Sequence, residues 1–158
     1  MMNVIVFGAS GATGRLVVEF AVAAGHMVTA FVRDARRLTV AQSRARVVEG
    51  DALDQTSVAN ALRGQDAVIC TLGTMPAGKE DMARRQPGVP VCSVGTRNIL
   101  TAMESCGCRR LVVESSASVG DSYSAGILGA GFIVRLALKQ VMEDKELQEA
   151  ATMASDCN

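Results

Sequence analysis

Residues 4–15 have the sequence VIVFGASGATGR, in which an apolar run through Phe7 is followed by Gly8, Gly11 and Gly14. A segment with helical periodicity comes directly after these glycines. A glycine-rich turn between a buried strand and an amphipathic helix brings backbone amides and the positive end of a helix dipole together. Such a turn can hold the pyrophosphate of a dinucleotide, whereas a tight strand-to-helix turn needs the same glycines without any ligand.

The rest of the chain alternates short apolar runs with helical patterns. The runs are rich in Val, Ile and Leu, and they predict strands that are buried on both faces of a parallel sheet. They cover Asn3–Phe7, Val28–Val32, Ala45–Val48, Ala67–Leu72 and Arg110–Val113. This alternation predicts an α/β fold of the Rossmann type, a doubly wound parallel sheet, with residues 1–158 forming one domain.

Apolar residues three and four positions apart predict the helix faces that contact the core. Three such faces are expected, formed by Leu16, Val17, Phe20, Ala21 and Ala24, by Val94, Ile99, Leu100 and Met103, and by Leu136, Val141 and Leu147 within a helix over 132–154. Gly25, Gly64 and Gly107 each stand between a helical segment and a strand, as expected for left-handed residues that end helices.

Composition excludes several classes of protein. The chain has 158 residues, of which 49% are hydrophobic and 20% charged, so it is not expected to be disordered. Its 16 basic and 16 acidic residues balance, and only 3% are aromatic, which argues against a nucleic-acid partner. We find no secretory signal, no apolar run long enough for a bilayer, and no cysteine or histidine spacing typical of a metal site. A cytoplasmic protein without a membrane or metal partner is expected.

The residues around the glycines suggest how a dinucleotide would be held. Ser10, Ala12 and Thr13 lie along the same loop, and Thr13 can add a hydroxyl donor. The next strand ends in FVRDARRL, where Arg33 and Arg37 offer guanidinium groups that suit a 2′-phosphate. This pattern favours NADP(H) over NAD(H), although a solvated basic turn would look the same.

The third and fourth strands are followed by candidate adenosine contacts. Asp51 and Ala52 follow the third strand, and the Asp51 carboxylate could accept a hydrogen bond from the adenine amino group or cap the next helix. Asp54 is better placed for capping. Leu72 and Gly73 follow the fourth strand, and Gly73 would let the backbone approach a ligand closely.

Taken together, the runs GASGATGR, FVRD, VVEGD, DAVICTLGT, GTRNIL and RRLVVESS resemble the atypical short-chain dehydrogenase/reductases. They are most similar to the NAD(P)H-binding group that includes biliverdin reductase B/flavin reductase and the NmrA-like proteins. The resemblance implies a Rossmann sheet with one bound NADP and hydride transfer to flavins, quinones or similar planar acceptors. It places Gly8, Gly11, Thr13 and Gly14 at the pyrophosphate, Arg33 and Arg37 at the 2′-phosphate, Asp51 at the adenine, and Ser115 or Ser116 near the nicotinamide and substrate.

The chain departs from this family pattern in two ways. Lys145 stands where the lysine of a Tyr-x-x-x-Lys pair would be, but Val141 replaces the tyrosine, and Tyr123 lies in a loop. Its neighbours in the run MEDKELQE are mostly acidic, so Lys145 is interpreted as an ordinary helix lysine. Relatives also continue into further C-terminal strands, so a Rossmann domain that is short at its C-terminus is expected here. Two functions are consistent with the pattern: an NADPH-dependent reductase with a small-molecule acceptor, or a non-catalytic NAD(P)-sensing protein of the NmrA-like type. The oligomeric state is left open.

Overall fold

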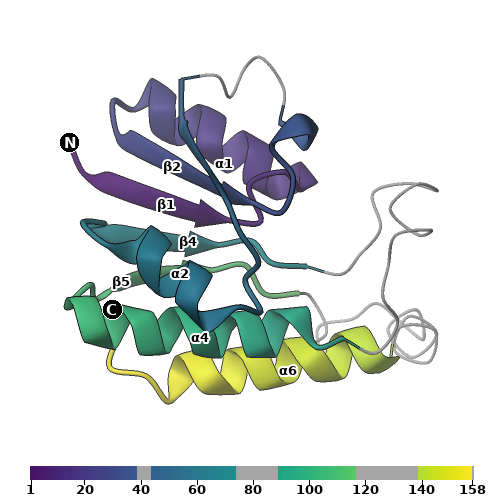
Figure 1. The fold of residues 1–158 in the computed structure, drawn as a ribbon. Helices are drawn as coiled ribbons and strands as arrows, with labels where there is room; N and C mark the ends of the chain where they lie inside the picture. The colour runs from purple at the N-terminus through teal and green to yellow at the C-terminus, as the bar shows by residue number, and fades with distance from the viewer. Residues whose placement is uncertain (39–43, 74–88, 117–138, 158) are drawn as a thin grey trace.

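The computed structural model describes residues 1–38, 44–73, 89–116 and 139–157. Its five strands form one parallel sheet in the order β3-β2-β1-β4-β5 (Figure 1). Their bounds are β1 Asn3–Phe7, β2 Met27–Val32, β3 Arg46–Glu49, β4 Ala67–Cys70 and β5 Arg110–Val113. The predicted α/β sheet of the Rossmann type is confirmed, and each predicted strand is found with its ends shifted by two residues at most.

Helices cover the two faces of this sheet unequally. Their bounds are α1 Ala12–Ala23, η1 Ala35–Arg37, α2 Gln55–Leu62, α4 Val91–Cys106 and α6 Lys139–Met153. Helix α1 lies over β1 and β2 on one face, whereas α2 and α4 cover the other face and α6 packs along α4 (Figure 1). Among these described helices, none has the length and the apolar run needed to cross a lipid bilayer.

The sheet divides the core into two clusters, as a doubly wound fold requires. On the α1 face, Val6 and Ala30 of the strands pack with Val18 of the helix. On the other face, the larger cluster joins Ile5 and Val68 to α2 and α4, and it includes the fully buried Leu62, Ile99 and Met103. The predicted inner face of α4 is confirmed at Ile99, Leu100 and Met103, whereas Val94 is half-buried. The glycines at 25, 64 and 107 have the positive φ expected at helix ends.

The predicted inner face of α1 is wrong in part. Leu16 and Phe20 are 54% and 70% exposed, and the buried line instead runs through Gly14 and Val18. Val17 and Ala21, which belong to the same apolar stripe, are partly buried against the core. The stripe is wider than the contact that α1 makes with β1 and β2, so its outer edge meets no described part of the sheet.

Two strands are less buried than their sequences predict. β3 and β5 form the edges of the described sheet, and Val47 and Val112 on them are 41% and 62% exposed. A run of apolar residues has the same appearance in a central and an edge strand, because the sequence does not show which neighbours cover each face.

The inner face of α6 also differs from the prediction. Val141 is buried as expected, but Leu147 is 58% exposed. The buried positions beside Val141 are Met142 and three polar residues, Asp144, Lys145 and Gln148. Leu136 lies outside the described residues. Hydrophobic periodicity missed this face because its contacts with the rest of the protein are largely polar.

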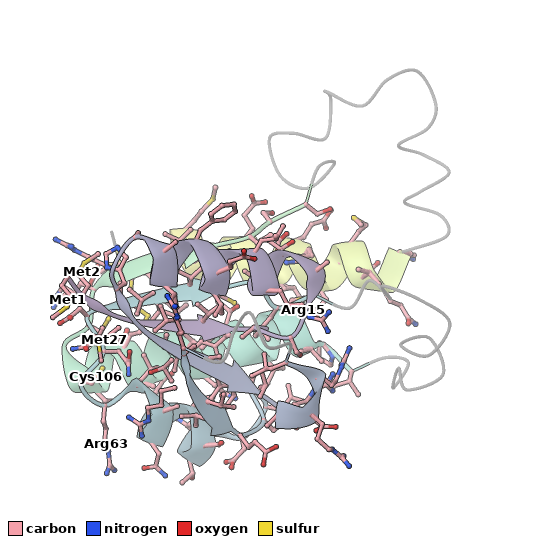
Figure 2. All side chains as sticks on the ribbon, turned by 90° about the horizontal axis from the view of Figure 1, so that it is seen from above. Met1, Met2, Arg15, Met27, Arg63 and Cys106 are labelled. Atoms are coloured by element: carbon pink, nitrogen blue, oxygen red, sulfur yellow. The ribbon has the colours of Figure 1, made fainter. Side chains whose placement is uncertain are left out.

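All five strands are parallel, so their carboxyl ends lie along one edge of the sheet, where open α/β sheets bind ligands. Figure 2 shows Arg15 toward this edge, and Met1, Met2 and Met27 at the opposite edge. The candidate residues after β1 to β5 therefore share one side of the molecule.

Candidate cofactor-binding site

The turn after β1 is held against the end of β4. Gly8 has a φ of 80°, and a Cβ at this position would lie 2.6 Å from the carbonyl oxygen of Thr71. Both the backbone N–H and the hydroxyl of Thr71 donate to the carbonyl of Phe7, each at 2.9 Å. The backbone conformation and the close approach of the two loops together require glycine at position 8.

Helix α1 begins at this turn, and no side chain caps its first backbone amides. Gly11 is the N-cap, its N–H donates to the carbonyl of Gly8 at 2.9 Å, and the first turn contains no acidic residue. A Cβ on Gly14 would overlap the carbonyl oxygen of Gly8 and lie 2.8 Å from its carbonyl carbon. The glycines thus bring the helix N-terminus directly onto the turn, and its amides and dipole fit a pyrophosphate group.

The other loop residues lie beside this helix start. Ser10 is half-buried, and Ala12 and Thr13 are exposed. The Thr13 hydroxyl donates to the carboxylate of Glu114 at 2.8 Å, from the residue that follows β5. The sequence motifs do not point to Glu114, although its place directly after a parallel strand could have indicated it. That Thr13 contacts a phosphate stays a prediction.

The turn after β2 contains an internal ion pair. Two nitrogens of the Arg36 guanidinium donate to the two oxygens of Asp34 at 2.9 and 3.0 Å, and the Asp34 hydrogen bond raises the pKa of Arg36. Glu49 accepts from the Ala35 N–H at 2.7 Å and fixes the start of η1. The Arg33 side chain is exposed and makes no hydrogen bond or ion pair with the described parts of the chain.

Arg15 ties the helix start to this turn. Its Nη2 donates to the carbonyl of Arg37 at 2.9 Å, while its buried Nε has no hydrogen-bond partner within the described ranges. The contact spans 22 positions in the chain, so no local pattern could have predicted it. Arg15 thereby sets the distance between the glycine loop and the basic turn.

The residues after β3 are engaged with their own backbone. Asp51 is exposed, and its Oδ1 accepts from the Leu53 N–H at 3.0 Å. Asp54 caps α2 by accepting from the Thr56 N–H at 3.0 Å, as predicted. Ala52 is buried, and its carbonyl accepts from the side-chain amide of Asn98 at 2.9 Å. Contacts of Asp51 and Ala52 with an adenine stay predictions.

The segment after β4 is fixed through its backbone. The Leu72 carbonyl accepts from Lys145 Nζ at 2.8 Å and from Cys92 Sγ at 3.4 Å. Gly73 is exposed, and no described atom lies within 4 Å of the position that its Cβ would take. The packing of the described residues would therefore admit a side chain at position 73, so a close approach to a ligand remains the predicted reason for this glycine.

Lys145 is not the ordinary helix lysine that the sequence indicated. It is 6% exposed, and its Nζ donates to the carbonyls of Leu72 and Glu114 at 2.8 and 2.7 Å and to Gln148 Oε1 at 2.9 Å. Three contacts use all three donors of the ammonium group. Lys145 thus joins the segments that follow β4 and β5 to helix α6.

The neighbouring acid is also buried and has a capping function. Asp144 accepts from the backbone N–H groups of Cys92 and Ser93 at 2.8 and 2.9 Å, so α6 supplies the side-chain cap for the first turn of α4. A carboxylate at this place also suits the helix dipole. Burial raises the pKa of the Cys92 thiol to about 12, so this cysteine is not a thiolate nucleophile near neutral pH.

The serines after β5 lie at the same edge of the sheet. Ser115 is exposed, with its Oγ 3.5 Å from Glu149 Oε1, and Ser116 is half-buried. Their proposed place beside a nicotinamide stays a prediction. Tyr123 and most of the segments that follow β4 and β5 lie outside the described residues.

A parallel sheet in this order, with an open helix N-terminus after β1, defines a dinucleotide-binding protein of the Rossmann type. Comparison with known families makes this assignment more specific. A family model described as NAD(P)H-binding matches residues 8–158, and the chain belongs to that family. The resemblance inferred from the sequence motifs is thereby confirmed, and a nicotinamide cofactor follows from it.

Individual relatives agree with this assignment. The 3-diazoavenalumate denitrifying reductase of a Streptomyces species is 34% identical over 119 residues, which cover 73% of this chain but 38% of that protein. The structure of anaerobillin reductase ChuY from Escherichia coli O157:H7 has a TM-score of 0.75 and 25% identity, covering 99% of this chain and 69% of that one. The oxidoreductase ylbE from Lactococcus lactis shares the fold, with a TM-score of 0.76, 20% identity and coverage of 99% and 65%.

Proposed function

We propose that this chain binds NADPH at the carboxyl edge of its sheet and serves the transfer of a hydride to a flavin, a quinone or a similar planar acceptor. The observation that carries this proposal is the uncapped N-terminus of α1, held on the Gly8 turn by glycines that leave no room for side chains. Bound there, the cofactor would supply the hydride, while the chain would provide binding and orientation.

The preference for NADPH over NADH rests on the turn after β2. A carboxylate at this point would accept from the 2′-hydroxyl of NADH, but Asp34 is occupied by Arg36. Arg33 is exposed beside it, and the Arg15 contact keeps Arg37 next to the glycine loop. The exposed guanidinium group of Arg33 suits a 2′-phosphate better than a hydroxyl.

Arg33→Ala tests this preference. We expect the affinity for NADPH to fall about 10- to 100-fold, since a charged hydrogen bond contributes about 1.5–3 kcal/mol, and the affinity for NADH to stay unchanged. Fluorescence titration of both nucleotides measures the ratio. Arg63→Ala is the matched control, because Arg63 is exposed and ends α2, well away from Arg15 in Figure 2. Equal losses for NADPH and NADH would contradict recognition of a 2′-phosphate.

The acceptor is proposed from the family resemblance and from relatives named as reductases. Ser115 or Ser116 would donate a hydrogen bond to the acceptor as negative charge develops on it. The decisive experiment adds FMN, and then a quinone, to the protein with saturating NADPH and follows cofactor oxidation at 340 nm. Acceptor-dependent oxidation that Ser115→Ala or Ser116→Ala reduces is the expected result. NADPH binding without turnover on either acceptor would overturn the reductase proposal.

A second candidate is a non-catalytic NAD(P)-sensing protein. It is favoured by the surroundings of Lys145, whose three donors are all occupied, and by the buried Val141 at the tyrosine position. A proton relay of the Tyr-x-x-x-Lys type is therefore absent from these positions of α6. A sensor should bind NADP⁺ and NADPH with different affinities and show no turnover. Titration of these two nucleotides, together with the oxidation assay at 340 nm, would reveal this.

A further inference from the structure

The side chain of Glu114 lies beside the start of α1, although Glu114 follows β5 in the chain. Its carboxylate accepts a hydrogen bond from the hydroxyl of Thr13, in the first turn of the helix, at 2.8 Å. Its backbone is held on both sides, because its N–H donates to the Cys70 carbonyl at 2.9 Å and its carbonyl accepts from Lys145 Nζ at 2.7 Å. The side chain is exposed, so it can turn away from α1 while its backbone stays in place.

This carboxylate brings a negative charge to the site where an anion would bind. Within the described ranges, no lysine or arginine forms an ion pair with Glu114. The N-terminus of α1, which has no acidic residue in its own first turn, attracts negative charge through its dipole. In this structure Glu114 supplies that charge from across the sheet.

We propose that Glu114 acts as a built-in anionic competitor for the N-terminus of α1 and thereby lowers the affinity of the site for a pyrophosphate group. This inference rests on the proposed nucleotide binding. A phosphate at the glycine loop is repelled by the carboxylate, and full binding requires the Glu114 side chain to swing out. Glu114 is thus an affinity-determining residue that takes no part in hydride transfer.

The substitution Glu114→Gln removes the charge and keeps an oxygen that can accept from Thr13. We expect it to tighten NADPH binding about tenfold at about 20 mM salt, and much less at about 500 mM, because salt screens the repulsion. Isothermal titration calorimetry of the full chain at both salt concentrations measures the two affinities. Glu19→Gln, an exposed carboxylate farther along α1, is the matched control and should leave both unchanged.

Three results would overturn the inference. If the unsubstituted chain binds NADPH and Glu114→Gln binds it equally tightly, Glu114 does not compete, and the proposed function is unaffected. If Glu114→Gln binds more weakly, the carboxylate supports binding. If neither protein binds NADPH, both the proposed function and this inference fail. Thermal unfolding of each variant shows whether it is folded, and Glu114→Ala is the second variant to use if the glutamine variant is not.

Discussion

Lys145→Met is expected to lower the melting temperature of the protein by about 10 °C. The substitution keeps an unbranched side chain of nearly the same length but leaves the Leu72 and Glu114 carbonyls and the Gln148 amide oxygen without the ammonium donor. Buried acceptors that lose their partner cost about 1–3 kcal/mol each, and relaxation and water reduce the sum to about 3 kcal/mol. For a chain of this length, each kcal/mol corresponds to roughly 2–4 °C.

Lys139→Met is the matched control for this experiment. Lys139 lies on the same helix, but its side chain is 72% exposed, and its ion pair with Glu143 spans 3.7 Å. Exposed pairs of this kind contribute little, so the melting temperature should change by no more than about 2 °C. Differential scanning calorimetry compares the two variants. Equal small shifts for both would mean that the contacts of Lys145 do not stabilise the fold.

Gly14→Ala is expected to weaken NADPH binding about a hundredfold. The added Cβ would overlap the carbonyl oxygen of Gly8, and both groups belong to the backbone, so α1 must move away from the loop. About 3 kcal/mol of strain or displacement corresponds to this loss of affinity. The measurement is a nucleotide titration below the melting temperature of the variant, which circular dichroism establishes first.

Two further glycine substitutions show whether the loss of NADPH affinity is specific to position 14. Gly64→Ala also strains a residue with positive φ, at 75°, but it lies between α2 and β4, away from the loop. It should cost about 1 kcal/mol of stability and leave NADPH affinity unchanged. Gly11→Ala should have an intermediate effect, since its Cβ would lie 3.2 Å from the Gly8 carbonyl oxygen. Full affinity in Gly14→Ala would show that the close approach of α1 is not needed for binding.

The sequence was sufficient to predict the order of the elements and the glycine loop. Each strand is a short run of branched apolar residues, and a run of this kind predicts a strand without reference to distant parts of the chain. The glycines after β1 are similarly informative, because the conformation of Gly8 and the crowding at Gly14 exclude other residues. The cap at Asp54 was predicted for the same reason, since its partner is only two residues away.

The errors concern contacts between distant parts of the chain. The charged neighbours of Lys145 on α6 indicate an ordinary helix lysine, yet its partners at Leu72 and Glu114 are 73 and 31 positions away. The apolar stripe on α1 predicts that Leu16 and Phe20 lie in the core, yet both are exposed. Such a stripe shows how wide the apolar face of a helix is, but not how much of that face the sheet covers.

What the amino-acid sequence determined by itself is the sheet, its helices and the loop that begins α1, because local spacing and backbone conformation specify them. Tertiary structure alone decided how the ends of the strands are held: Arg15 on the Arg37 carbonyl, Asp144 on the start of α4, and Glu114 on Thr13. These pairs form only when the fold brings remote groups together. The residues next to a polar side chain in the sequence do not show which distant group it will contact.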